Sequence, residues 1–202
     1  MTGLIYLIVT LAFGSVPFGL IVGHYVAGID VRDVGSGNIG ATNVGRALGF
    51  RWGAITMVLD VLKGALPVWL AGGVAEGSGF AGCVALTAFV GHCWSIFLDF
   101  RGGKGVATGG GAMLALAPWP TLAAILVWVG LRLGTGRASI ASLAAAGVLV
   151  LAVAMGAGEV LWVALVLAVG VVIRHRDNID RLRRGEELQS EPVWDNETEL
   201  ES

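Results

Sequence analysis

Long apolar runs dominate the chain and indicate its architecture. There are six such runs, and segments containing Gly, Pro or charged residues separate them. The runs cover residues 3–27, 52–74, 80–98, 106–133, 138–156 and 159–173. About 20 consecutive apolar residues form a helix long enough to cross the hydrocarbon core of a bilayer. The pattern therefore predicts an all-α polytopic membrane protein.

The number of passes depends on the fourth run. Pro118 and Pro120 flank Trp119 near its middle. Prolines remove helix hydrogen-bond donors, and tryptophan is enriched at membrane interfaces, so the run is expected to break into 106–117 and 121–133. Whether these two short segments both cross the membrane fully is left open, because about 20 residues are needed for a complete pass.

The positions of Lys and Arg favour this break. With it, every loop that contains a basic residue lies on one side of the membrane, as the positive-inside rule expects. Without it, the last two basic segments fall on opposite sides. We therefore expect about seven transmembrane helices, with the N-terminus outside and the C-terminus in the cytoplasm.

Composition separates a membrane body from a polar tail. The chain is 55% hydrophobic and 14% charged, and half of its 28 charged residues follow residue 173. Soluble domains carry roughly 25% charged residues. We expect one integral membrane domain over residues 1–187 and a flexible acidic cytoplasmic tail over 188–202. The acidic tail argues against nucleic acid as a partner.

The first polar loop, residues 35–46, combines glycines with short hydrogen-bonding side chains. Glycines let backbone N–H groups converge on an anion, and an arginine adds a fork for phosphate. A tight interhelical turn is the alternative. A G-x-G-x-x-G spacing occurs here, but no strand precedes it as a dinucleotide site requires. The candidate phosphate ligands are Ser36, Gly37, Asn38, Thr42, Asn43 and Arg46.

The second polar loop leads directly into the fourth apolar run. A helix N-terminus behind Gly-Gly-Lys suits phosphate binding. Gly105 follows the lysine where a Walker A loop has Ser or Thr, so nucleotide hydrolysis is not supported. Simple anchoring at the membrane interface is the alternative. The candidate residues are Arg101, Gly102, Gly103 and Lys104.

The third polar segment follows the last apolar run and is expected to continue that helix into the cytoplasm. His175 and Asn178 are three residues apart and share a helix face, which can point toward the other two loops. A basic stop-transfer flank is the competing interpretation. Ser139, near the inner end of another run, is an additional candidate donor.

Two charged residues lie within the second apolar run. Asp60 and Lys63 are three positions apart, and each charge costs about 2.5–3.5 kcal/mol at the centre of a membrane helix. They either contact substrate or pair with each other and support the first loop. His24, His92 and Cys93 are expected to be packed side chains, so no metal site is predicted.

Together, the three polar segments predict a cytoplasm-facing pocket that can neutralise two phosphate groups beside the hydrocarbon of the membrane. Such a pocket suits chemistry that joins a lipid to a water-soluble phosphate ester. A phosphate-ester transporter or channel needs the same features, so the spacing of these residues leaves both functions open.

The chain also resembles the bacterial acyl-phosphate:glycerol-3-phosphate acyltransferase family over about residues 4–187. Three signatures and an accessory motif carry the resemblance, namely SGNIGATNVGR at 36–46, FRGGKGVAT at 100–108, HRDNIDRLRRGEE at 175–187 and DVLKG at 60–64. Ser95 is a departure, because proline is expected there. It touches no proposed catalytic group.

The resemblance implies transfer of a fatty acyl group from acyl phosphate to the 1-hydroxyl of sn-glycerol 3-phosphate. The products are lysophosphatidate and phosphate, in the first acylation of phospholipid synthesis. It implies a seven-helix enzyme of the bacterial inner membrane that needs no cofactor. The expected partners are the two substrates and membrane lipid, with functional coupling to the soluble acyl-phosphate-forming enzyme as an open question.

The resemblance also assigns roles by position. Ser36 and Arg46 would bind or orient phosphate, and Lys104 with its neighbouring glycines would hold glycerol 3-phosphate. His175 and Asn178 would complete the reaction centre. These five residues form the expected catalytic set.

Overall fold

The computed structural model describes residues 1–74 and 77–189, and all regular structure in these ranges is helical. This confirms the all-α prediction. The α-helices are α1 (Thr2–Gly14), α2 (Phe18–Ala27), α3 (Ala41–Leu48), α4 (Phe50–Leu70), α5 (Ser78–Cys93), α6 (Val106–Leu116), α7 (Pro118–Thr135), α8 (Ala138–Gly156), α9 (Leu161–Arg174) and α10 (Arg176–Arg184). Residues 190–202 of the expected tail lie outside the described ranges.

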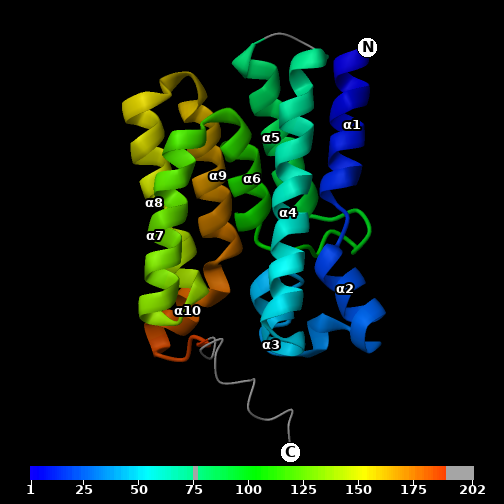
Figure 1. Cartoon of the computed structure of the whole chain (residues 1–202), viewed down its shortest axis with the longest axis vertical. Helices are drawn as coiled ribbons and strands as arrows, with labels where there is room; N and C mark the ends of the chain where they lie inside the picture. The colour runs from blue at the N-terminus through cyan, green and yellow to red at the C-terminus, as the bar shows by residue number, and fades with distance from the viewer. Residues whose placement is uncertain (75–76, 190–202) are drawn as a thin grey trace, which may run out of the picture.

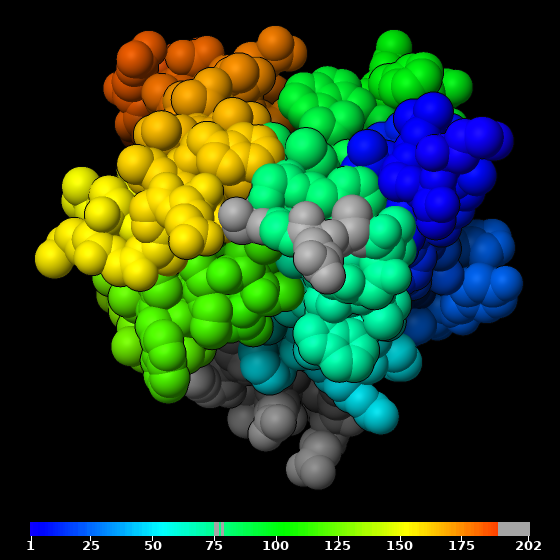
Figure 2. Space-filling view, turned by 90° about the horizontal axis from the view of Figure 1, so that it is seen from above, coloured from blue at the N-terminus to red at the C-terminus, as the bar shows by residue number. Residues whose placement is uncertain are grey.

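The long helices run side by side as a bundle, with the first and third polar segments at one end of it and the loop between α5 and α6 about halfway along it (Figure 1). The short helices α3 and α10 lie at this end. The opposite end carries the N-terminus, and Figure 2 looks onto it, with α1 in blue and the α8–α9 connection in yellow. The bundle therefore has one polar end, where residues distant in sequence meet.

The outer surface of the bundle is apolar. Among the described residues, three segments are long and apolar enough to cross a membrane, Thr2–Ala27, Phe50–Gly73 and Ala138–Gly156. The bent pair α9 and α10 makes a fourth candidate when it is taken as one span. Large side chains such as Leu126 and Met155 are exposed on this surface. Water disfavours such extensive apolar exposure, whereas lipid accepts it.

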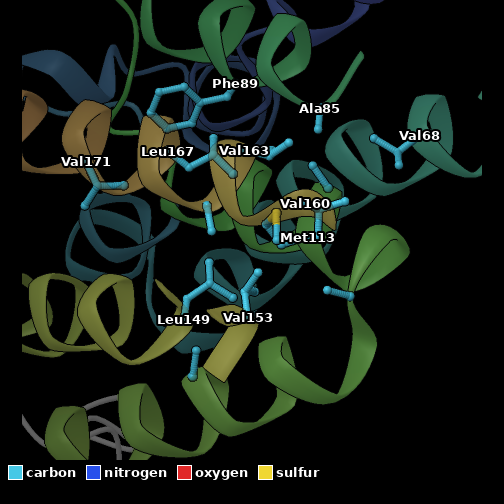
Figure 3. Close-up of a cluster of buried hydrophobic side chains, with 14 of the residues drawn as sticks. Val68, Ala85, Phe89, Met113, Leu149, Val153, Val160, Val163, Leu167 and Val171 are labelled. Atoms are coloured by element: carbon cyan, nitrogen blue, oxygen red, sulfur yellow. The ribbon is translucent and has the colours of Figure 1, made fainter. Parts of the chain in front are cut away.

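The interior is packed by small and medium-sized side chains. One cluster of buried residues joins α5, α6, α8 and α9, and Figure 3 shows Phe89, Met113, Val153 and Leu167 within it. Glycine allows α4 and α6 to approach closely: a Cβ on Gly64 would lie only 2.0 Å from the Thr108 carbonyl oxygen. Small residues at such contacts are typical of membrane helix packing.

Helix breaks position the polar segments. The predicted break in the fourth run is confirmed, since α6 ends at Leu116 and α7 begins at Pro118. The first run was expected to be continuous, but α1 and α2 are separate helices with Pro17 between them. The last helix was expected to continue through the third polar segment, but α9 ends at Arg174 and a second helix, α10, begins at Arg176 with a bend of 56° between them.

Candidate active site

A pocket of about 480 Å³ lies between α4, α6, α7, α8 and α9. Its polar end is formed by residues of all three polar segments, so the predicted convergence of these segments is what the structure shows. The rest of the wall is mainly apolar. The predicted site residues on the wall are Ser36, Asn38, Thr42, Asn43, Arg46, Asp60, Lys104, Ser139, His175 and Asn178.

Asn43 organises the first loop. Its Oδ1 accepts hydrogen bonds from the Ser36 backbone N–H at 2.8 Å and from the Ser36 hydroxyl at 3.1 Å. Its Nδ2 donates to the carbonyl oxygens of Val31 at 2.7 Å and Val34 at 3.0 Å. The amide is buried within these contacts. It therefore shapes the loop and holds Ser36 at the pocket wall.

Hydrogen bonds fix two glycines of the second loop through both their N–H groups and their carbonyl oxygens. The N–H groups of Gly102 and Gly103 donate to the carbonyl oxygens of Cys93 at 3.2 Å and His92 at 3.0 Å. The two glycine carbonyls accept from Arg174, at 2.8 Å for Gly102 and 3.0 Å for Gly103. These four hydrogen bonds fix the peptide units immediately before Lys104.

Close packing explains the glycine at position 103. A Cβ there would lie 2.1 Å from Nε2 of the buried His92 side chain. The next glycine, Gly105, has a φ of 77° and forms the N-cap of α6, a conformation that side chains disfavour. The glycines thus allow Lys104 to enter the pocket at the start of α6.

Burial at the polar end shifts the pKa values of two pocket residues. Burial lowers the pKa of the Lys104 ammonium to about 8, although the nearby Glu187 carboxylate opposes this shift. Burial and the charge of Lys104 lower the pKa of His175 to about 4. At neutral pH the pocket therefore contains a cationic lysine and a neutral imidazole.

The tautomer of His175 follows from its hydrogen bond. Its Nδ1 lies 2.8 Å from the Val171 carbonyl oxygen. A carbonyl can only accept, so Nδ1 carries the proton and Nε2 is left as an acceptor. This arrangement fits His175 to receive a hydrogen bond from a substrate hydroxyl.

Glu187 fixes the orientation of Asn178. Its Oε1 accepts from Asn178 Nδ2 at 2.6 Å, and its Oε2 accepts from Arg181 Nε at 2.9 Å. Burial would raise the pKa of the Glu187 carboxyl, but interactions with Ser139, Asn178 and Arg181 hold it below its ordinary value. Asn178 Oδ1 is buried with no hydrogen-bond partner among the described residues. It is thus a second acceptor available to a ligand.

Asp60 and Lys63 form an ion pair, which was one of the two alternatives left open by the sequence. Their Oδ1 and Nζ atoms are 2.8 Å apart, and both side chains are almost fully buried. Lys63 also donates to the Val16 carbonyl oxygen at 2.8 Å, in the break between α1 and α2. Asp60 lies 3.7 Å from His92, which packs beneath the second loop. Among the described contacts, the pair supports these two segments, whereas support of the first loop was expected.

Several predicted residues are not on the described pocket wall. Arg101 is exposed, and Lys63 is buried beside the pocket. Gly102 and Gly103 position the lysine that follows them. Gly37 has a φ of 66° and serves the turn of the first loop. These residues act on the pocket through backbone shape or through neighbouring side chains.

The sequence analysis did not identify two residues that organise the site. Arg174 supports the second loop, and its guanidinium lies over the Trp94 ring at 5.5 Å. Glu187 orients Asn178. Arg174 directly precedes the predicted His175, and Glu187 ends the third signature, so position in the sequence was the only available signal.

Ser95 replaces the expected proline outside the pocket. Its hydroxyl donates to the Ser15 carbonyl oxygen at 2.6 Å, and the Ile96 N–H donates to the Ser15 hydroxyl at 3.4 Å. The second loop is thereby joined to the break between α1 and α2. This contact agrees with the expectation that the departure touches no proposed catalytic group.

The fold is that of an integral membrane protein, and its pocket joins an end with basic and hydrogen-bonding side chains to a mainly apolar wall. The chain belongs to the glycerol-3-phosphate acyltransferase family, whose model matches residues 4–185.

Individual relatives agree with this membership. The glycerol-3-phosphate acyltransferase of Anaeromyxobacter sp. (strain Fw109-5) is 48% identical over 182 residues, covering 86% of this chain and 89% of the relative. That of Desulfovibrio desulfuricans is 43% identical over 189 residues, covering 93% and 84%.

Solved structures show the same fold. The crystal structure of PlsY (YgiH), an integral membrane glycerol 3-phosphate acyltransferase, in its glycerol 3-phosphate form has a TM-score of 0.88 and 37% identity, covering 94% of this chain and 96% of that one. The lysophosphatidic acid form has a TM-score of 0.87 and 36% identity, covering 94% and 95%.

Proposed function

We propose that the protein transfers a fatty acyl group from acyl phosphate to the 1-hydroxyl of sn-glycerol 3-phosphate, giving 1-acyl-glycerol 3-phosphate and phosphate. One observation carries this proposal: a single pocket joins a cationic, hydrogen-bonding end to a long apolar wall. The family membership supports the same reaction. No cofactor is required, because acyl phosphate is already an activated donor.

The polar end would hold the two phosphate groups. Lys104, behind its fixed glycines, would bind glycerol 3-phosphate, while Ser36 and Arg46 would orient the phosphate of the donor. The remaining predicted ligands would support them, with Asn38, Thr42, Asn43 and Ser139 on the wall and Gly37, Arg101, Gly102 and Gly103 as loop residues. Charge-assisted hydrogen bonds suit such groups, because they are about twice as strong as neutral ones.

The chemical step would be a direct transfer. The 1-hydroxyl oxygen forms a bond to the acyl carbon, and the bond from this carbon to the phosphate oxygen breaks. His175 Nε2 and Asn178 Oδ1 are acceptors that can align the hydroxyl. The hydroxyl proton passes to the departing phosphate, which leaves as the hydrogen phosphate dianion. Burial lowers the pKa of His175 to about 4, so the neutral imidazole aligns the hydroxyl and is not the final acceptor of this proton.

The same proposal sets the topology. Seven passes arise when α1 and α2 count as one span and α4 to α9 each count as one. An odd number of passes puts the two termini on opposite sides of the membrane. With the basic loops inside, the N-terminus would lie outside, the C-terminus in the cytoplasm of the bacterial inner membrane, and the pocket would face the cytoplasm. Residues 1–187 would form the enzyme domain and 188–202 the acidic tail. A cytoplasmic site would receive acyl phosphate from its soluble producing enzyme.

Arg174 gives a specific prediction about the second loop. We expect Arg174→Gln to raise the KM for glycerol 3-phosphate about tenfold, with a smaller change in kcat. The reason is that hydrogen bonds to charged groups contribute about 1.5–3 kcal/mol, and losing them releases the peptide units before Lys104. The measurement is the initial rate as a function of glycerol 3-phosphate at saturating donor.

Arg176→Gln is the matched control, because it removes the same charge two residues away. The Arg176 side chain is 80% exposed. The KM of Arg176→Gln for glycerol 3-phosphate is expected to stay at the wild-type value. If the two variants have the same KM for glycerol 3-phosphate, Arg174 does not support the second loop.

Product formation tests the proposed function against transport. Purified protein in detergent would receive labelled glycerol 3-phosphate with acyl phosphate, acyl-CoA or acyl carrier protein carrying an acyl group. We expect lysophosphatidate with acyl phosphate alone. A folded preparation that makes no product, yet accumulates labelled glycerol 3-phosphate in sealed vesicles, would favour the transporter.

A further inference from the structure

The apolar part of the pocket opens toward the surrounding lipid. Val58 and Leu62 of α4 line one side of it, and Ile125 and Val129 of α7 line another. All four side chains are at least 39% exposed. An acyl chain bound at the polar end therefore has a continuous apolar path along α6 between α4 and α7.

Helix α6 contains three consecutive glycines, and packing explains two of them. A Cβ on Gly111 would lie 2.1 Å from the Val61 carbonyl oxygen, and a Cβ on Gly109 would lie 3.3 Å from the Phe89 ring. A Cβ on Gly110 would meet no described atom within 4 Å. Packing therefore does not explain Gly110. Helix stability does not explain it either, because glycine within a helix is less stable than alanine.

Gly110 lies on the pocket wall. It follows Val106 by one helical turn and precedes Leu114 by another, and these two residues also line the pocket. Each step of four residues advances about 6 Å along the helix. Because α6 begins at Val106, just after Lys104, a side chain at position 110 would project beside the acyl chain, about one turn beyond the start of the helix.

From this geometry we infer that Gly110 is a specificity-determining residue, whose missing side chain keeps the pocket wide enough for long acyl chains. The inference rests on the proposed function, since it assigns the apolar wall to the acyl donor. A larger side chain at position 110 narrows the path for the distal carbons and leaves the reacting carbonyl and both phosphates in place. Short donors are then affected less than long ones.

A graded series tests this inference, with Gly110→Ala, Gly110→Leu and Gly110→Phe in lipid nanodiscs. The readout is the ratio of kcat/KM for hexadecanoyl phosphate to kcat/KM for hexanoyl phosphate. We expect the ratio to fall progressively, by less than about threefold for alanine and by about 10- to 100-fold for phenylalanine, since misfit of small apolar groups discriminates on this scale.

Gly130 provides the matched control. It lies on α7, is exposed, is absent from the described pocket wall and would also accept a Cβ without contact. Gly130→Phe is expected to keep the wild-type ratio. An unchanged ratio in folded Gly110→Leu and Gly110→Phe would overturn the inference, as would an equal fall in Gly130→Phe.

A binding measurement separates this inference from the proposed reaction. Thermal stabilisation by hexadecyl phosphate and by hexyl phosphate reports chain-length preference without turnover. We expect Gly110→Phe to lose stabilisation by the long ligand and to keep stabilisation by the short one. This result would support the role of Gly110 even if no lysophosphatidate formed. Equal loss for both ligands would contradict it.

Discussion

Replacing Asp60 with asparagine is expected to lower the free energy of unfolding by about 3–5 kcal/mol, because it leaves Lys63 buried without its counter-charge. The two side chains are 3% and 1% exposed, and their charged atoms are 2.8 Å apart. Lys63 keeps only the Val16 carbonyl and the Phe18 ring as described partners. Denaturation of the purified protein in detergent measures the effect.

The double variant Asp60→Leu/Lys63→Met distinguishes two effects: loss of the ion pair, and the cost of leaving one buried charge without its partner. A buried pair replaced by apolar residues of similar volume is often neutral in stability. We therefore expect the double variant to recover most of the loss. Asp180→Asn is the exposed control, because Asp180 pairs with Arg183 at 3.6 Å on the surface. If Asp60→Asn is as stable as Asp180→Asn, the buried pair does not support the fold.

Replacing Lys104 with alanine is expected to raise the KM for glycerol 3-phosphate by about 10- to 150-fold. The estimate follows from the loss of one charge-assisted contact, about 1.5–3 kcal/mol, at about 1.4 kcal/mol for each tenfold change. Steady-state kinetics at saturating acyl phosphate measures it. Arg51→Ala is the control, because it removes an exposed positive charge away from the described pocket wall.

The same residue predicts a pH dependence. The pKa of Lys104 is lowered to about 8, so its charge is present below pH 8 and is lost as the pH rises through that value. Affinity for glycerol 3-phosphate should therefore weaken above about pH 8. Arginine stays protonated in this range. Lys104→Arg should remove this step, and an alkaline step that persists in Lys104→Arg would assign it to another group.

The all-helical fold was predictable, because a membrane imposes long apolar runs that form helices. Pro118 correctly predicted the break before α7. The bend at His175 and the amphipathic helix α3 were not predicted. Both occur in short polar segments, where hydropathy gives no period long enough to define a helix and where contacts with other elements fix the geometry.

The candidate site was predictable as a set of loops but not as a network of contacts. Ser36, Lys104 and His175 could be identified from residue type and motif, and all three line one pocket. The support of Gly103 by Arg174 joins residues 71 positions apart, and sequence spacing does not show such a contact. The open space at Gly110 likewise depends on the neighbouring helices.

The central claim is that one pocket holds donor and acceptor together for direct acyl transfer. Initial rates of lysophosphatidate formation, measured while both substrate concentrations are varied, test it most directly. We predict intersecting double-reciprocal lines, because both substrates must be bound before transfer. Parallel lines, together with an acyl group attached to the protein when glycerol 3-phosphate is absent, would contradict the claim and indicate a covalent intermediate.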